Sequence, residues 1–492
     1  MSRNYVSSVA IFSALLIFHA SLNAEKSDRL LVRITSTPEK MLTLSRRPLD
    51  FASMAQKTPR DAIVTEKELV SLLSEGYQVE ILQRESDLAG QSLDPFYHTL
   101  EETHEYLQTV ERLYPYLAKL HTIGKSTRFS LPIWALKISD NPDEDEDEPA
   151  VLIDAMHHAR EPLGNEICLA FIDYLISRYG WDERVTSWVN DFEIWVIPVM
   201  NPEGYKYLID NSLASPWWRK NLRDNDLNGA VNLDYDGVDL NRNYDLNWTY
   251  AGSSSPADWT YRGPSPFSED ETRAKRDLAL RERFAVAITY HSYGETIMYQ
   301  WSWPGTDGRA PDHNLLRKMA SEMAGRIQNL SGMGTYTYSR QTAANQSSPW
   351  IYAVTGTLEF LVETGTSFIP LDSSIIRTVV ETNLEGLFYL LERLRGPGIA
   401  GRVIDRKTGS PLEALVSIVE IDDFSTIEPR KSHPQTGRFT RLLEPGKYTL
   451  RVWARGFNPA RIPLNIGSEL LEKDIIMIPL RDRKPADRSP RK

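Results

Sequence analysis

The spacing of apolar positions divides this chain into a central region of alternating strands and helices with a smaller region on each side. In the central region, 91–396, continuous apolar runs predict buried strands, and runs with helical spacing predict helices that cover them. The predicted strands are 121–123, 133–138, 150–155, 192–200, 285–293 and 357–363. The predicted helices are 94–117, 161–179, 314–330 and 373–395. This alternation predicts an α/β domain with a largely parallel or mixed sheet.

The part of the chain before this region contains two different patterns. Residues 1–24 combine a positive start with an apolar run of about 12 residues, Val9 to Ala20, which is the layout of a secretory signal peptide. Residues 25–90 predict a small αβ unit in which Thr65 and Glu68 have the spacing of a helix capping box. This unit is either a pro-segment or an additional structural layer.

The part that follows the central region has short strand-like runs separated by turn signals. Residues 397–480 therefore predict a small all-β sandwich. The basic, proline-containing residues 481–492 predict a disordered tail.

Composition narrows the class of protein. The chain has 492 residues, of which 41% are hydrophobic and 25% charged, and this is typical of a globular protein with about three domains. Its net charge of −11 argues against binding to nucleic acid or to an anionic membrane. No run after residue 24 approaches membrane-spanning length. The single cysteine, Cys168, excludes an intrachain disulfide and indicates a buried core residue. Export with one cysteine favours a bacterial periplasmic or extracellular protein.

A candidate metal site begins where the predicted strand 150–155 ends. His158 and Glu161 form an H-x-x-E pair that can converge on one ion, whereas His157 cannot form the same pair because Arg160 follows it at that spacing. Two imidazoles and one carboxylate are a known ligand set for catalytic zinc. His291, at the end of another predicted strand, is the candidate third ligand, although a histidine in such a place is commonly structural.

Five motifs in a fixed order then make the pattern specific. They are H-A-R-E at 158–161, N-P-E-G-Y at 201–205, W-R-K-N at 218–221, G-V-D-L-N-R-N at 237–243 and T-Y-H-S-Y at 289–293. A sixth segment, 350–370, contains L-V-E-T-G. Together they resemble the zinc metallocarboxypeptidases of the carboxypeptidase A type over about residues 94–395. The resemblance implies that family's mixed, eight-stranded sheet flanked by helices. Residues 397–480 resemble the carboxypeptidase regulatory-like, transthyretin-like domain.

The resemblance also implies roles for individual residues around the metal. His158, Glu161 and His291 would hold one Zn²⁺, and Asp239 would accept a hydrogen bond from His158 and orient it. Glu363 would be the general base; Glu359, on the same face of the same predicted strand, is its rival.

Further residues would bind the substrate. Asn241 and Arg242 would bind its terminal carboxylate, because a guanidinium matches a carboxylate with two parallel hydrogen bonds. Arg160 would add positive charge. Arg219 would stabilise the developing oxyanion, with Arg223 as the alternative.

Two further roles concern specificity. Tyr338 is the candidate for the mobile tyrosine that closes over the substrate, although counting back from Trp350 without gaps reaches Gln341 instead. Ser348 occupies the position that often senses the substrate side chain. Because Ser348 is uncharged, it argues for neutral or broad specificity rather than for strictly basic residues.

A second candidate cation site lies between these motifs. Asp224, Asp226, Asn228 and Gly229 have the D-x-D-x-N-G start of a calcium loop. The twelfth position is Tyr235 rather than glutamate, which excludes an EF-hand. One structural Ca²⁺ and a plain polar turn both remain open here.

The sequence thus predicts an exported, periplasmic or secreted zinc metallocarboxypeptidase that removes C-terminal residues from peptides and proteins. One alternative is a hydrolase of peptidoglycan stem peptides, or of another amide, on the same fold. The other is a non-catalytic binding module, against which the intact set of metal-binding and acidic residues argues.

Overall fold

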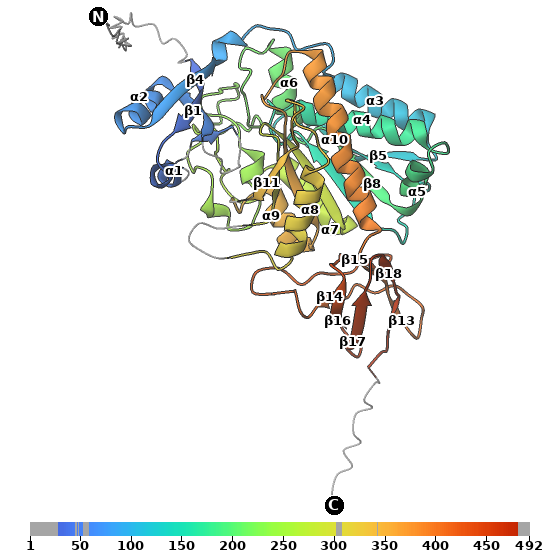
Figure 1. The fold of residues 1–492 in the computed structure, drawn as a ribbon. Coiled ribbons are helices and arrows are strands. Elements are labelled where there is room, and N and C mark those ends of the chain that lie inside the picture. The colour runs from blue at the N-terminus through green and yellow to red at the C-terminus, as the bar shows by residue number, and fades with distance from the viewer. Residues whose placement is uncertain are drawn as a thin grey trace, which may run out of the picture.

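A computed structural model describes residues 28–480 of the chain, apart from 45, 46, 48, 53–58, 302–307 and 342. The predicted signal peptide (1–24) and basic tail (481–492) lie outside the described residues. The described part forms a small N-terminal segment, a central α/β region and a C-terminal β region (Figure 1). None of its helices has the length and apolar character needed to cross a bilayer.

The central region is built on one eight-stranded mixed sheet, as predicted. Its strands are β5 (Ala118–Lys125), β6 (Pro132–Ile138), β7 (Ala150–Ala155), β8 (Glu193–Ile197), β9 (Val286–Ser292), β10 (Thr296–Tyr299), β11 (Thr337–Arg340) and β12 (Leu358–Thr364). Their order is β11-β10-β12-β9-β7-β8-β6-β5. Strands β8, β7, β9 and β12 are parallel neighbours. Their carboxyl ends therefore meet at one edge of the sheet, where ligand sites of α/β proteins form.

Helices cover both faces of this sheet. They are α3 (Leu100–Leu113), α4 (Leu163–Arg178), α5 (Glu183–Asp191), α6 (Pro202–Asp210), α7 (Asp270–Glu282), α8 (His313–Ala324), α9 (Ser347–Thr355) and α10 (Ser373–Leu394). Residues of α3, α4, α8 and α10 share one hydrophobic core with the sheet. Residues of α7 and α9 form a second core on the opposite face. The sheet is thus a middle layer, buried on both sides (Figure 1).

Two predictions for the helices need correction. The helix predicted over 94–117 begins only at Leu100, because Thr99 caps it: the Thr99 side chain accepts from the Glu102 amide while Glu102 accepts from the Thr99 amide. Helices α5, α6, α7 and α9 were not predicted. In α7 the buried positions include Glu271, Lys275 and Glu282, so its core-facing side carries no continuous apolar stripe.

The N-terminal segment has a sheet and helices of its own. It consists of β1 (Arg29–Thr35), α1 (Pro38–Leu44), β2 (Asp50–Phe51), β3 (Arg60–Thr65), α2 (Glu66–Ser74) and β4 (Gln78–Arg84). The predicted capping box of Thr65 and Glu68 is present. Successive side chains of a strand point to opposite faces, and in this sheet both faces carry apolar residues. Leu30 and Val32 belong to the segment's own core, while Leu31 and Ile63 pack into the core of the central region.

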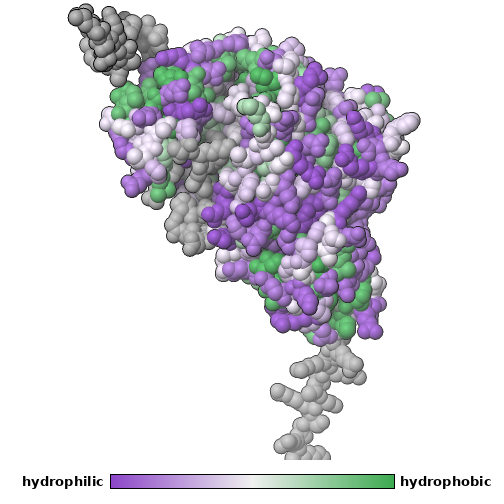
Figure 2. Space-filling view, viewed as in Figure 1, coloured by the Kyte–Doolittle hydropathy of each residue, from purple (hydrophilic) through white to green (hydrophobic). Residues whose placement is uncertain are grey.

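The C-terminal region is all β, as predicted. Its strands are β13 (Gly398–Asp405), β14 (Leu415–Ile418), β15 (Arg438–Leu442), β16 (Gly446–Trp453), β17 (Ala460–Ile466), β18 (Leu470–Glu472) and β19 (Ile475–Met477). They form two small sheets, one built around β13 and one of order β14-β16-β17, with one hydrophobic core. Figure 2 shows a largely hydrophilic face with hydrophobic residues gathered over the N-terminal segment and this β region.

Candidate active site

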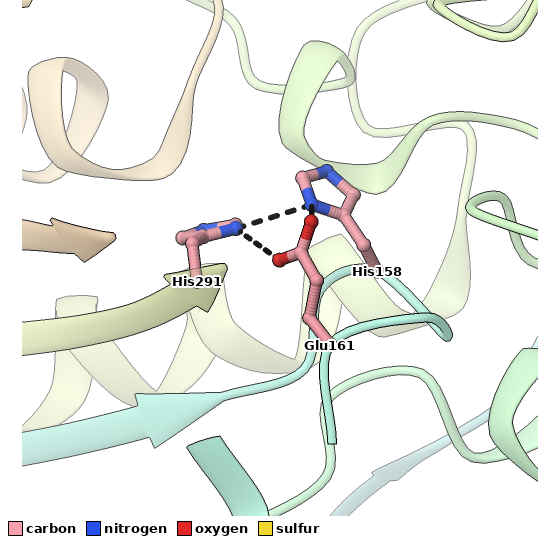
Figure 3. A group of neighbouring side chains, drawn as sticks. All are labelled: His158, Glu161 and His291. Atoms are coloured by element: carbon pink, nitrogen blue, oxygen red, sulfur yellow. Dashed lines mark hydrogen bonds and ion pairs between the residues drawn. The ribbon is translucent and has the colours of Figure 1, made fainter. Parts of the chain in front are cut away.

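The three predicted metal ligands meet at the carboxyl edge of the central sheet. His158 and Glu161 lie in the connection from β7 to α4, and His291 lies near the end of β9. Because β7 and β9 are parallel neighbours, the residues that follow them leave the sheet side by side. The three side chains point toward one another (Figure 3) and form a buried group whose ligand atoms lie within 4.8 Å.

The geometry of this group fits a small divalent cation. The His158 Nδ1 is 2.8 Å from Glu161 Oε1, and the His291 Nδ1 is 2.9 Å from Glu161 Oε2. The two Nδ1 atoms are 3.1 Å apart. Tetrahedral zinc with Zn–N bonds near 2.0 Å separates its ligand nitrogens by about 3.3 Å, so a slight spreading of the group would admit the ion.

Burial and charge prepare these side chains as ligands. Burial lowers the pKa of His291 to about 4, which keeps the ring neutral and its nitrogen lone pair available at neutral pH. Burial alone would raise the pKa of Glu161, but the neighbouring His158 and His291 outweigh it and lower that pKa. His157 is not part of the group: its Nε2 lies 2.9 Å from the Tyr244 hydroxyl, as expected from its sequence context.

Asp239 links the metal group to a guanidinium. Its Oδ1 is 3.1 Å from His158 Nε2, and its Oδ2 accepts from the Arg219 Nε at 2.9 Å. Burial alone would raise the pKa of Asp239, but Arg219, Arg242 and His158 together hold it well below the usual range. The ionised carboxylate can then accept the Nε2 proton of His158, which leaves Nδ1 free to bind metal.

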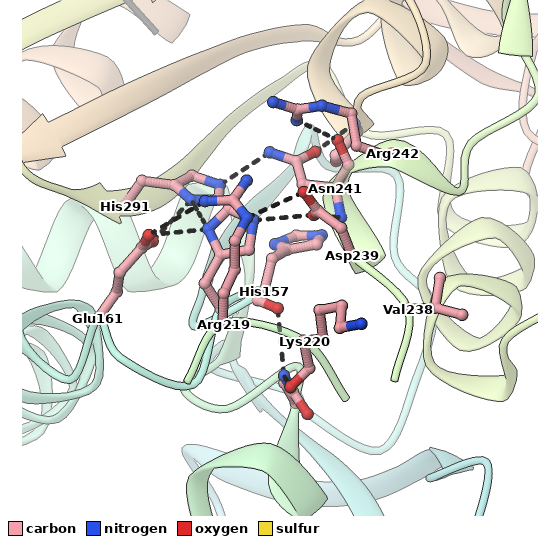
Figure 4. Close-up of polar contacts among 12 residues, drawn as sticks. His157, Glu161, Arg219, Lys220, Val238, Asp239, Asn241, Arg242 and His291 are labelled. Carbon is pink, nitrogen blue, oxygen red and sulfur yellow. Dashed lines mark hydrogen bonds and ion pairs between the residues drawn. The ribbon is translucent and has the colours of Figure 1, made fainter. Parts of the chain in front are cut away.

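The structure also separates Arg219 from its alternative. The Arg219 NH1 is 3.9 Å from Glu161 Oε1, so the guanidinium lies directly beside the metal group (Figure 4). Arg223 is instead paired with Glu269 at 3.1 Å, and its side chain is 31% exposed. Of these two arginines, Arg219 is thus the one that lies beside the metal group, and its role at the oxyanion stays a prediction.

Asn241 and Arg242 lie on the other side of the group, on the 3₁₀ turn Leu240–Arg242. The Asn241 Nδ2 is 3.2 Å from His291 Nε2. The Arg242 guanidinium donates to the Asn241 carbonyl oxygen at 2.7 Å, and the charge of Glu363 acts on it. Burial, together with the positive charge of Arg219, lowers the pKa of Arg242. The side-chain amide of Asn241 and the guanidinium of Arg242 can both donate hydrogen bonds to an anion.

Glu363 and Glu359 occupy different environments on β12. Glu363 is the register partner of His291 on the parallel strand β9, so the two residues stand side by side at the sheet edge. Glu359 lies four residues earlier, within a buried cluster. It accepts from Lys275 at 2.7 Å and from the Ser347 hydroxyl at 2.9 Å, and Lys275 also donates to Asp154 at 2.6 Å. Glu359 is thus bound in a structural ion cluster, whereas Glu363 lies beside a metal ligand.

Arg160 is paired with a residue outside all the motifs. Its two terminal nitrogens donate to Asp50 of the N-terminal segment at 2.6 and 2.8 Å. Asp50 also lies 4.0 Å from Arg219. Burial alone would raise the pKa of Asp50, but Arg160, Arg219 and Arg29 lower it, so the carboxylate is ionised. Sequence reasoning missed Asp50 because no motif or period distinguishes it within 25–90.

The residues predicted to determine specificity lie on other elements than the metal group. Tyr338 is on the edge strand β11 and is 37% exposed, while Gln341 is buried and bonded to Gln346. Ser348 is buried at the start of α9. The roles of Tyr338 and Ser348 therefore stay predictions.

The calcium-like loop holds a guanidinium of this chain. Asp224, Asp226 and Asp236 form a group of metal-binding size. Arg128 donates to Asp236 at 3.0 Å and to the carbonyl oxygens of Gly229 and Ala230 at 2.9 Å. A positive side chain therefore already compensates this loop, and a structural Ca²⁺ there stays a prediction.

Comparisons with known proteins agree with this geometry. The profile of the zinc carboxypeptidase family matches residues 103–385. The chain is 29% identical over 334 residues to carboxypeptidase A2 of Rattus norvegicus, a match that covers 66% of this chain and 76% of that protein. It is 31% identical over 253 residues to a zinc carboxypeptidase of Saccharothrix mutabilis subsp. capreolus, covering 48% and 56%. The crystal structure of thrombin-activatable fibrinolysis inhibitor shares the fold, with a TM-score of 0.61 at 23% identity over 74% of this chain and 98% of that chain.

The ligand set can be tested by metal content. We expect wild-type protein dialysed against buffered zinc to retain one Zn²⁺ per chain, and His291→Ala or Glu161→Gln to lose it. Asp239→Asn should weaken zinc binding by roughly 10- to 100-fold, because it only orients a ligand. His98→Gln is the control, since that half-exposed histidine lies outside the group. Elemental analysis together with chelator competition measures all four variants; full zinc retention by His291→Ala would refute the site.

Proposed function

The chain belongs to the zinc carboxypeptidase family, and we propose that residues His158, Glu161 and His291 hold the one Zn²⁺ with which it removes C-terminal amino acids from peptides and proteins. The observation that carries this proposal is the convergence of these three buried ligands beside Glu363, Arg219 and Arg242. When bound, Zn²⁺ lowers the pKa of a coordinated water and polarises the scissile carbonyl.

In this proposal Glu363 is the general base. It takes a proton from the attacking water and later delivers that proton to the leaving amine. Its register position next to His291 supports the assignment, because the base must lie within reach of a water at the metal. The rival Glu359 has its carboxylate oxygens bonded to Lys275 and Ser347, which supports the choice of Glu363.

The other site residues stabilise the reacting carbonyl oxygen and bind the substrate. Arg219 stabilises the negative charge that develops on the carbonyl oxygen, since it lies beside Glu161 and is held there by Asp239. Asn241 and Arg242 bind the terminal carboxylate of the substrate. Arg160 adds positive charge for substrate binding. Tyr338 closes over the substrate, and the uncharged Ser348 favours neutral or broad specificity.

We further propose that the N-terminal segment is a pro-segment that blocks the site. Asp50 places a carboxylate on Arg160 and near Arg219, as a substrate or product carboxylate would. The metal group, Glu363, Arg219 and Arg242 are each at most 5% exposed with this segment in place. The segment also has its own hydrophobic core, so it can separate as a folded unit. Export through a signal peptide, to the periplasm or beyond, completes the proposal.

The base assignment is tested by two matched variants. We expect Glu363→Gln to keep one zinc per chain and an unchanged melting temperature while kcat falls by roughly 10²- to 10⁴-fold. Glu359→Gln should lower the melting temperature, because it leaves Lys275 with one carboxylate partner fewer, while retaining most of kcat. The reverse pattern would assign the base to Glu359.

Arg242 is tested with paired substrates that end in a free carboxylate or an amide. Wild-type enzyme should prefer the free carboxylate, and Arg242→Gln should remove most of that preference, a loss of about 1.5–3 kcal/mol for a charge-assisted hydrogen bond. Arg223→Gln should leave the preference unchanged. Ratios of kcat/KM for the two substrates provide the measurement; equal ratios in wild type and Arg242→Gln would exclude this role.

The blocking role is tested with Asp50→Asn in the chain that retains the N-terminal segment. Loss of the buried ion pair with Arg160 should loosen the segment and raise kcat/KM at least tenfold, since breaking such a pair costs about 3–5 kcal/mol. Glu75→Gln is the control, because its partner Arg47 lies within the segment. Unchanged activity in Asp50→Asn would leave the segment a purely structural layer.

A further inference from the structure

The C-terminal β region is attached to the central region through buried guanidinium groups. Arg430, Arg438 and Arg441 have side chains that are at most 6% exposed. Arg430 pairs with Asp312 at the start of α8, and Arg438 pairs with Glu193 on β8. Arg441 pairs with Asp422 of its own region at 2.9 Å. Each of these contacts brings positive charge to the boundary between the two regions.

A small cavity lies at this boundary. Its walls come from the central region, including Arg283 and Gly356, and from the β region, including Arg430 and Lys431. Arg438 and Arg441 line it as well. Its volume of about 30 Å³ exceeds what one water molecule needs. Every charged residue among its described lining is a cation.

Two guanidinium donors at this cavity lack a partner. The terminal nitrogens of Arg430 bond to Asp312 and to the Gly356 carbonyl oxygen, but its buried Nε makes no hydrogen bond. The Asp422 Oδ1 lies 3.8 Å from that Nε, too far for a hydrogen bond. The buried Nε of Arg283 also makes no hydrogen bond. Buried donors are rarely left in this state, and each unsatisfied one is costly.

The acidic side chains around the cavity are paired with other nitrogen atoms and do not accept a hydrogen bond from either Nε group. Glu413 lies 3.5 Å from both Arg283 and Lys431 and is shared between them. Asp312 and Asp422 are engaged by Arg430 and Arg441. Gly356 packs closely on the Arg430 side chain, since a Cβ there would come within 2.8 Å of the Arg430 Nε. A ligand that satisfies the cavity therefore has to bring negative charge and several acceptor atoms.

We propose that this cavity binds one small tetrahedral oxyanion, of the sulfate or phosphate class, between the central and C-terminal regions. Such an ion would accept from the Nε groups of Arg283 and Arg430 and from Lys431. It would link the two regions at a place remote from the metal group. The inference is independent of the catalytic assignments, since none of these side chains takes part in them.

Sulfate is the probe, because a calorimetric titration can follow its binding directly. Zinc-loaded full chain is titrated with sodium sulfate at constant ionic strength balanced by sodium chloride. We expect saturable binding of one ion per chain, which phosphate displaces and chloride does not. Absence of saturable heat, or full competition by chloride at equal concentration, would overturn the proposal.

Substitutions locate the bound ion. Arg283→Gln should raise the Kd for sulfate at least tenfold. Lys431→Gln should raise it several-fold, and because that side chain is 44% exposed the variant should fold normally. Lys447→Gln is the control, since it removes an exposed lysine that does not line the cavity. Wild-type affinity in both Arg283→Gln and Lys431→Gln would place the ion elsewhere and refute the site.

Discussion

Burial of charge at the carboxyl edge of the central sheet is the constraint on which this structure depends. A charged group removed from water is tolerated only when it is paired and hydrogen-bonded. The metal group satisfies this rule through a chain of contacts from Glu161 to His158, Asp239 and Arg219. Each link fixes the next, so the ligands are oriented before any ion arrives. Parallel strands make this possible because their ends bring distant parts of the chain to one place.

The same rule explains which parts of the fold could be predicted from the sequence. Strands such as 150–155 and 285–293 are buried on both faces and read as continuous apolar runs, so their type and place were predicted correctly. Helix α7 was missed because its inner positions carry Lys275, Glu271 and Glu282. Those charges are stabilised by partners on other elements, such as Asp154, which an apolar period cannot reveal. Tertiary pairing here overrides the local pattern.

Some residues of the site could likewise be predicted from the sequence and others could not. Residues within motifs, such as His158, Glu161 and His291, could be named from the sequence, and the structure brings them together. The family resemblance favoured Glu363 over Glu359 as the base, although both share one face of a strand. The contacts support that preference, because Lys275 binds Glu359 while register places Glu363 beside His291. Asp50 could not be found at all, since its role depends wholly on where the N-terminal segment docks.

Buried ion pairs connect both flanking regions to the central region. The N-terminal segment contacts the site region through the bidentate pair of Asp50 with Arg160 and through Asp61, which accepts from the Tyr293 hydroxyl. One face of its sheet has a core of its own, and the other packs on the central region. In the C-terminal region, Arg430 and Arg438 form ion pairs with acidic side chains of the central region. Removing the N-terminal segment would expose Arg160, which a peptide can then use. Removing the β region would take Arg430 from Asp312 and leave Glu193 with Lys137, and no substrate would replace the lost guanidinium groups. The first contact therefore suits a detachable cover, and the second suits a permanent support.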